Sequence, residues 1–278
     1  MTKPRDRCSP AEAGCREHFV DAVLYDYEYR RRRADINFYR QIARNRMEFG
    51  DGAILDLACG SGRLLLPLVH DGHRVVGIDR SPEMLAAAAR RIRRLSPSRR
   101  QRCTLVRADL RAFAVQREAT LAISAFHSVQ HLLTDEDLRR FLACARSALG
   151  KGGWLAFDLL PPDPAWLGRD PERRWARTTF RHPSTGQRLV YTTNHAYDPE
   201  TRLLHMRLYY QPVSEDGLAS GKERTVRLCH RQFHPDEIAR ALGLTGFRIL
   251  GEFGGFDGRQ MDGRPGLDDE QVYVAVAV

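Results

Sequence analysis

A repeated alternation of short apolar runs and helical patterns most constrains the fold of this chain. Five apolar runs predict strands, at residues 53–58, 73–79, 103–109, 119–126 and 153–160. Helical patterns lie between them, and one begins with Ser81 as N-cap and Pro82 at its first position. Repeated strand–helix units favour a parallel sheet with helices on both faces. We therefore expect a doubly wound α/β fold.

The pattern changes after residue 160. Four β-rich runs follow, separated by turn signals such as Asp216-Gly217. They predict an antiparallel β lid inserted at residues 161–233. A helical pattern and two strands at residues 234–278 then complete the core.

The N-terminal region divides into two parts. Residues 1–17 are polar, with Pro, Ser and Gly, and we expect them to be disordered. From residue 18, Phe19, Val23 and Tyr27 recur at helical spacing, which predicts amphipathic helices ahead of the first strand. We expect these helices to belong with the core as one unit, residues 18–160.

Composition narrows the function classes. No apolar run approaches the roughly 20 residues that span a bilayer, and the N-terminus lacks a signal-peptide core. We therefore expect a cytoplasmic protein with no membrane partner. The six cysteines are scattered without a CxxC pair, so we expect neither a disulfide framework nor a metal site.

The net charge of +9 comes mainly from arginine, concentrated at residues 30–33 and 90–102. Such runs indicate either solvated helix faces or attraction to an anionic acceptor or nucleic acid. Because no aromatic residue interleaves the second run, base stacking on it is not expected, and a nucleic-acid partner is disfavoured.

A Gly-rich turn follows the first expected strand. Gly60 and Gly62 let backbone amides approach a ligand, and the next helix points its positive N-terminus at the same space. Asp79 ends the second strand, where a carboxylate can accept hydrogen bonds from a ribose diol. Leu65 stands where a dinucleotide motif has its third Gly, which argues against a dinucleotide.

The third strand ends in Asp109 and Leu110, an acid that can hold an adenine amino group and an apolar residue that can cover the ring. Asp79 or Asp109 alone could equally be a helix cap. Three such strand ends in order together indicate a nucleoside ligand.

The segments ILDLACGSGRLLLPL, GIDRSPEML, ADLRAF and ALGKGGWLAFDL resemble class I S-adenosylmethionine (SAM)-dependent methyltransferases. The segment YDYEYRRRRADINFY and the β-rich insertion resemble a small-molecule subgroup that includes amino-sugar N,N-dimethyltransferases. The resemblance implies a Rossmann-like sheet and SAM as cofactor, with S-adenosylhomocysteine as product. It also implies methyl transfer to an N or O atom of a small-molecule acceptor, a secondary metabolite.

Several alternatives stay open at this point. The chain could methylate RNA or protein, or it could bind a nucleotide without catalysis. An anionic acceptor and a homodimer also stay open.

The resemblance also implies site residues. Those for the cofactor are Tyr25, Arg33, Ala58, Gly60, Ser61, Gly62, Asp79, Arg80, Met84, Asp109, Leu110 and Phe126. Within this set, Ser61 would face the methionine part, Arg33 would pair with its carboxylate, and Arg80 with Met84 would flank the adenine.

The expected catalytic residues are His131, Tyr25 and Asp158. His131 follows strand four and matches a subgroup histidine, which could take a proton or orient the acceptor. Tyr25 would lie over the sulfonium, and Asp158 would face the same crevice as a reserve base. His127 stands where relatives have a small polar residue or Asn, so its role stays open.

Overall fold

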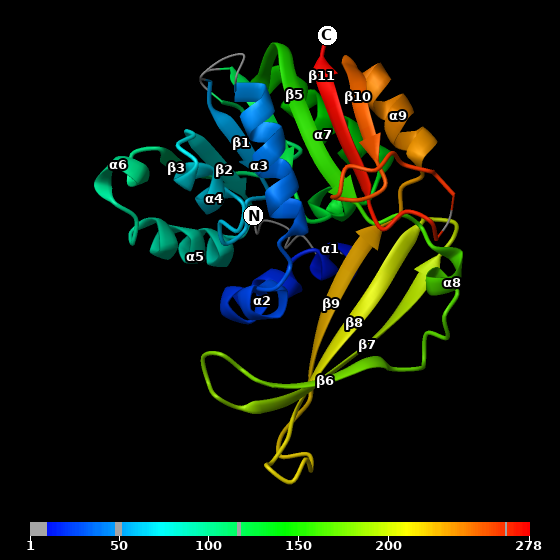
Figure 1. Cartoon of the computed structure of the whole chain (residues 1–278). Coiled ribbons are helices and arrows are strands. Elements are labelled where there is room, and N and C mark those ends of the chain that lie inside the picture. The colour runs from blue at the N-terminus through cyan, green and yellow to red at the C-terminus, as the bar shows by residue number, and fades with distance from the viewer. Residues whose placement is uncertain (1–9, 48–51, 116–117, 265) are drawn as a thin grey trace, which may run out of the picture.

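A computed structural model describes residues 10–47, 52–115, 118–264 and 266–278, and its core is a seven-stranded sheet (Figure 1). The strand order is β10-β11-β5-β4-β1-β2-β3. Strands β1 to β5 run parallel, and β11 and β10 are antiparallel additions at one edge. The strands are β1 (Ile54–Leu57), β2 (Val75–Asp79), β3 (Cys103–Arg107), β4 (Ala119–Ser124), β5 (Leu149–Leu159), β10 (Phe247–Phe253) and β11 (Gln271–Ala277).

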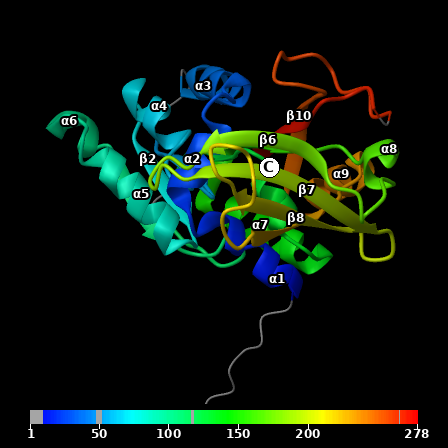
Figure 2. The same ribbon diagram turned by 90° about the horizontal axis from the view of Figure 1, so that it is seen from below.

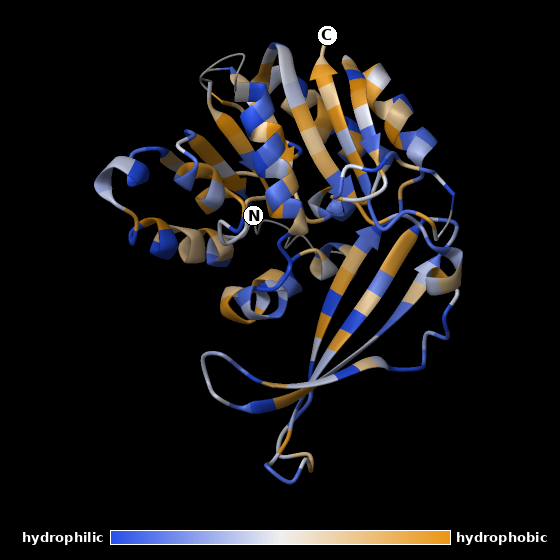
Figure 3. Cartoon of the chain, viewed as in Figure 1, coloured by the Kyte–Doolittle hydropathy of each residue, from blue (hydrophilic) through white to orange (hydrophobic). Residues whose placement is uncertain are grey.

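Helices cover both faces of this sheet, so the predicted doubly wound α/β class is confirmed. One face packs against α3 (Ala34–Met47), α4 (Leu65–His70) and α5 (Pro82–Ile92), and the other against α7 (Asp135–Ala148) and α9 (Pro235–Leu244). The strands between them are apolar along most of their length (Figure 3). Ser81 caps α5 by accepting a hydrogen bond from the Met84 amide, as its sequence position predicted. A short helix, α6 (Pro97–Arg100), leads into β3.

The inserted segment forms a separate four-stranded antiparallel sheet, also as predicted. After α8 (Pro164–Leu167) its strands are β6 (Trp175–Arg181), β7 (Arg188–Asp198), β8 (Leu203–Pro212) and β9 (Arg224–Arg231). In Figure 3 apolar and polar residues alternate along β8 and β9, as expected where one sheet face is packed. That face packs on α2 (Ala22–Tyr29) through Leu24, and Figure 2 shows the sheet passing across this helix.

The prediction of a disordered N-terminus is wrong for residues 10–17; residues 1–9 lie outside the described part of the chain. Residues 10–17 contain α1 (Pro10–Gly14), which packs on β9, and lead into a 3-10 turn, η1 (Glu17–Phe19). Cys15 is buried there beside Cys229, because a small thiol fits a gap that the polar composition of the segment did not reveal. The apolar spacing also misled at Val23, which is exposed, whereas its neighbour Leu24 is buried.

Among the described residues, no helix has the length and apolar character that crossing a membrane requires.

Candidate active site

A pocket of about 670 Å³ lies at the carboxyl ends of β1, β2 and β3, a size common for small-molecule sites. In the sheet order, the direction of winding reverses between β1 and β4, and open α/β sheets bind ligands beside such a point. Among the residues that line the pocket are nine of the predicted site residues: Tyr25, Ala58, Gly60, Asp79, Arg80, Met84, Asp109, Leu110 and His131.

Asp79 joins the ends of two strands at the floor of this pocket. Its carboxylate accepts the Gly60 amide at 2.8 Å and the Ser81 amide at 2.8 Å, which leaves lone pairs on both oxygens for a ligand. Burial raises the pKa of Asp79, which the two amide hydrogen bonds partly offset. Gly60 has a φ of +55°, and a Cβ there would meet no atom within 4 Å. The turn therefore leaves open space directly beside the carboxylate.

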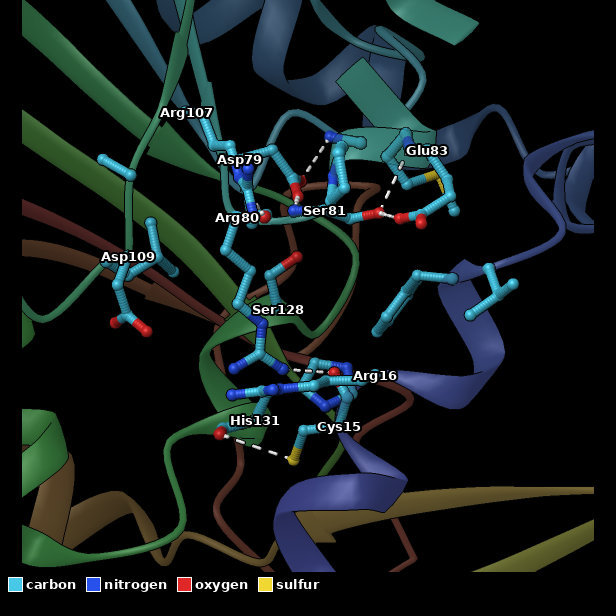
Figure 4. A pocket seen from close by; sticks show the side chains of 18 of the residues that line it. Cys15, Arg16, Asp79, Arg80, Ser81, Glu83, Arg107, Asp109, Ser128 and His131 are labelled. Atoms are coloured by element: carbon cyan, nitrogen blue, oxygen red, sulfur yellow. Dashed lines mark hydrogen bonds between the residues drawn. The ribbon is translucent and has the colours of Figure 1, made fainter. Parts of the chain in front are cut away.

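Arg80 and Asp109 shape the far end of the pocket. Asp109 accepts two hydrogen bonds of 2.8 Å from the side chain of Arg111, which lowers the pKa of Asp109 to about 2. Arg80 extends from the end of β2 and donates to the carbonyl of Cys15 (Figure 4). The Arg80 side chain thus ties the core to the N-terminal segment across the pocket.

That N-terminal segment forms a wall that sequence reasoning missed. Cys15, Arg16, Phe19 and Val20 line the pocket, and the Phe19 ring contacts both Tyr25, at 5.7 Å between centroids, and His131, at 5.2 Å. Phe19 could have been identified from the sequence as a candidate, because it is an aromatic residue in a predicted helix. For Cys15 and Arg16 the sequence held no signal, because their position depends on contacts with β9 and β2.

The antiparallel sheet backs this wall instead of lining the pocket. The pocket-lining residues belong to the N-terminal segment and the core, with none from β6 to β9. Glu17 binds Arg227 of β9, and Asp21 lies 3.1 Å from His182. On the α2 side, Tyr210 of β8 donates to Glu28 at 2.8 Å, and burial raises the pKa of Glu28 to about 7.

Four predicted cofactor residues, Arg33, Ser61, Gly62 and Phe126, do not line the pocket. Arg33 is exposed. Ser61 is buried and bonds to Asp26 and to the guanidinium of Arg91, the latter at 3.1 Å. A Cβ at Gly62 would lie 3.6 Å from Ala88, so this glycine packs toward α5.

Phe126 lies in an aromatic cluster behind the pocket. Its ring centroid is 4.9 Å from that of Tyr29 and 6.4 Å from that of Tyr25, and the Arg63 guanidinium lies 4.4 Å above it. Arg63 also forms an ion pair with the buried Asp35. This cluster therefore connects the Gly-rich turn with the end of β4.

His131 ends the 3-10 turn η2 (Ser128–His131) and lines the pocket. Burial, together with the charge of Arg80, lowers the pKa of His131 to about 3. Its ring packs against His230 at 4.7 Å between centroids, and its Nδ1 is buried without a hydrogen-bond partner among the described residues. His131 is thus a neutral hydrogen-bonding group near pH 7, not a strong base.

The prediction that Asp158 faces the crevice is wrong. Its carboxylate accepts the amides of Phe126 at 2.9 Å and His127 at 2.8 Å, and the Tyr39 hydroxyl at 2.5 Å. The end of β5 lies beneath the β4 turn, so the fully buried carboxylate satisfies backbone groups there. No signal at residue 158 alone distinguished this role from a catalytic one.

His127, Asp158 and Glu270 have potential metal-binding atoms within 4.8 Å of one another, the one such group among the described residues. His127 Nε2 lies 2.7 Å from Glu270 Oε2, a hydrogen-bond distance. Because Asp158 already accepts three hydrogen bonds, we interpret the group as linked by a proton and not by a metal.

Residues 54–153 match the methyltransferase domain family. They form a methyltransferase domain. A stretch of 133 residues is 31% identical to dTDP-3-amino-3,4,6-trideoxy-alpha-D-glucopyranose N,N-dimethyltransferase of Streptomyces venezuelae, covering 46% of this chain and 53% of that protein. The chain thus spans about half the length of the curated relatives that it matches. The resemblance seen in the sequence is confirmed.

Solved structures agree on the fold around the methyltransferase domain. The CcbJ methyltransferase from Streptomyces caelestis aligns with a TM-score of 0.73 at 18% identity, covering 95% of this chain and 99% of that chain. SAM-bound CalS10, an amino pentose methyltransferase from Micromonospora echinaspora, aligns at 0.67 with 19% identity, covering 91% and 95%. The likeness extends over both sheets, so the four-stranded sheet is part of a shared architecture.

Proposed function

We propose that this chain transfers a methyl group from SAM to an amine nitrogen of a small-molecule acceptor, an amino sugar or a related secondary metabolite. The observation that carries the proposal is Asp79, held by the Gly60 and Ser81 amides at the floor of a pocket inside the methyltransferase domain. The nitrogen acceptor is supported by relatives named as N-methyltransferases.

The residues present fit the cofactor. Asp79 has free lone pairs for the two ribose hydroxyls, and the space beside Gly60 admits a ligand. Met84 and Leu110 supply apolar surface for a flat base, and Asp109 retains acceptor capacity beside its Arg111 bonds. When bound, SAM supplies a methyl group already activated by its sulfonium.

The chain's own contribution is then to position the acceptor and exclude water. Phe19, Tyr25 and His131 form one side of the pocket. His131 lines the pocket as a ring that is neutral near pH 7, so it can help to orient the acceptor without carrying charge. Tyr25 and His131 are therefore proposed as acceptor-side residues, whereas Asp158 supports the backbone.

An anionic group on the acceptor is a finer proposal. A second cavity of about 500 Å³ adjoins the pocket and shares Arg16, Arg80 and Arg111 with it. Arg111 is paired with Asp109 and Asp137, but Arg16 and Arg80 have no carboxylate partner among the described residues. Two guanidinium groups that form no ion pair there favour a carboxylate or phosphate. A homodimer also stays a prediction, to be checked by light scattering.

The test combines binding with turnover. Calorimetry should detect S-adenosylhomocysteine, and a panel of amino sugars and matched hydroxyl sugars should show methyl addition by mass only for the amines. Gly60→Ala should weaken binding about tenfold, because its Cβ enters ligand space. Gly72→Ala is the matched control, since Gly72 also has positive φ with open space around it but lies outside the pocket. Equal losses in both variants, or methylation of hydroxyls alone, would contradict the proposal.

A further inference from the structure

A strained turn lies at the end of β4, beside the reversal point of the sheet. Phe126 and His127 are consecutive non-glycine residues in the left-handed region, with φ of 63° and 57°. Such a conformation is unfavourable for residues that carry a Cβ. It persists only where the surroundings impose it, which makes it a candidate functional feature.

Groups from three distant segments impose this turn. Asp158 at the end of β5 accepts both amides of the turn, and Tyr39 of α3 donates to the same carboxylate. Glu270, directly before β11, lies 2.7 Å from Nε2 of the His127 ring. His127 and Asp158 are buried and Glu270 nearly so, which strengthens the charge-assisted bonds among them.

The turn directs two rings in a defined way. The Phe126 ring joins Tyr25 and Tyr29 and lies under Arg63. The His127 ring stacks on Phe126 at 5.5 Å with an interplanar angle of 21°. A fixed His127 ring therefore fixes the Phe126 ring. The Phe126 ring in turn contacts Arg63, the residue that directly follows the Gly60–Gly62 turn.

We propose that His127 and Glu270 form a buried latch that positions Phe126 and Arg63 for cofactor binding. His127 and Glu270 are thus positioning residues of the site. This inference rests on the proposed function. Residue 127 was left without a role from sequence, and Glu270 gave no signal because 143 residues separate the two.

The latch holds a proton. Burial alone would lower the pKa of His127, but the Glu270 hydrogen bond and the charges of Asp158 and Glu270 raise it, against a smaller opposing effect of Arg32. Other titratable groups nearby are Tyr39, His131 and His230. Because the pKa is raised in the folded state, the latch contributes its full stability below the unfolded value. That contribution is lost as pH rises through the folded value.

Glu270→Gln tests the latch because it keeps the shape and removes the charge, whereas Glu270→Asp keeps the charge. NMR of ¹³C-histidine-labelled protein would follow the titration of His127, assigned by its loss in His127→Asn. Near-UV circular dichroism would report the aromatic cluster, and calorimetry would measure S-adenosylhomocysteine binding. Glu215→Gln and His205→Asn, both at exposed positions, are the matched controls.

We expect Glu270→Gln to lower the His127 midpoint by about one pH unit or more. The near-UV signal should change, and the dissociation constant for S-adenosylhomocysteine should rise about five- to tenfold. Glu270→Asp should recover most of the affinity, which a purely space-filling role would not predict. A lowered midpoint with unchanged near-UV signal and affinity would overturn the latch. If the wild-type protein binds no S-adenosylhomocysteine, the proposed function fails. The His127 titration midpoint and the near-UV signal would still test the latch.

Discussion

The two sides of the pocket are built in different ways. The cofactor side comes from three adjacent strand ends, and its main polar group, Asp79, is held by backbone amides of nearby turns. The acceptor side consists of the N-terminal segment and η2, with β9 packed behind them, and these segments lie far apart in the sequence. The first side is therefore shaped mainly by adjacent turns of one sheet, whereas the second is formed by segments that only tertiary packing brings together.

The two sides also differ in charge. Asp79 and Asp109 on the cofactor side have amide or guanidinium partners. The acceptor side buries three histidines, and burial lowers the pKa of His18 to about 4, of His131 to about 3, and of His230 well below its usual value. Acid should therefore damage the acceptor side first.

The largest expected effect is this loss of stability in acid. Each histidine with a lowered pKa stabilises the fold above the unfolded value of about 6.5, and that stability falls by about 1.4 kcal/mol per pH unit below it. From pH 7 to 5, His18 and His131 together should remove roughly 3–4 kcal/mol of unfolding free energy, and His230 should add to this loss. Urea titrations across this range would measure the slope. His230→Phe should reduce the slope of unfolding free energy against pH by the equivalent of about one proton. An unchanged slope would mean that His230 is already charged in the folded protein.

The next effect concerns the cofactor side. Asp79→Ala removes two charge-assisted hydrogen bonds to the ribose and should weaken SAM binding by about 3 kcal/mol, roughly 100-fold. Calorimetry on the folded variant would measure the dissociation constant for SAM. Asp198→Ala, in the antiparallel sheet and outside the pocket, is the control. Wild-type affinity in Asp79→Ala would refute the ribose assignment.

A smaller effect is expected at His131. Because its low pKa makes it a weak base at neutral pH, His131→Ala should lower turnover about tenfold through lost orientation. SAM affinity should stay within about 1 kcal/mol. His131→Asn, which keeps a hydrogen-bond acceptor, should recover part of the rate. A drop of 10³-fold or more, with loss of an ionisation from the pH–rate profile, would instead support base catalysis.

The smallest effect separates two arginines. Arg33 is exposed and outside the pocket, so Arg33→Gln should change SAM affinity less than twofold. Arg63, which follows the Gly-rich turn and is paired with Asp35, should matter more. Calorimetry on Arg33→Gln and Arg63→Gln would show which arginine contributes more to SAM affinity. A larger loss of affinity at Arg33 would support the pairing with the SAM carboxylate that the sequence suggested.

The sequence was informative where one residue and its local backbone define a position. Strand ends and the Gly-rich turn placed Asp79, Gly60 and Asp109 correctly at the pocket, and alternating β-runs predicted the second sheet. It was uninformative where position depends on distant packing. Asp158 looks identical in sequence whether it faces a crevice or satisfies the backbone of β4. Cys15 enters the pocket wall only because α1 packs on β9.

The wall formed by residues 15–25 also has a kinetic consequence. These residues form one side of the pocket. They are bonded to the core through Arg80 and to the antiparallel sheet through Glu17 and Asp21. Cofactor entry and product departure therefore involve the same bonded segment. We expect association well below the diffusion limit, with the exchange of S-adenosylhomocysteine for SAM governed by how often this segment opens.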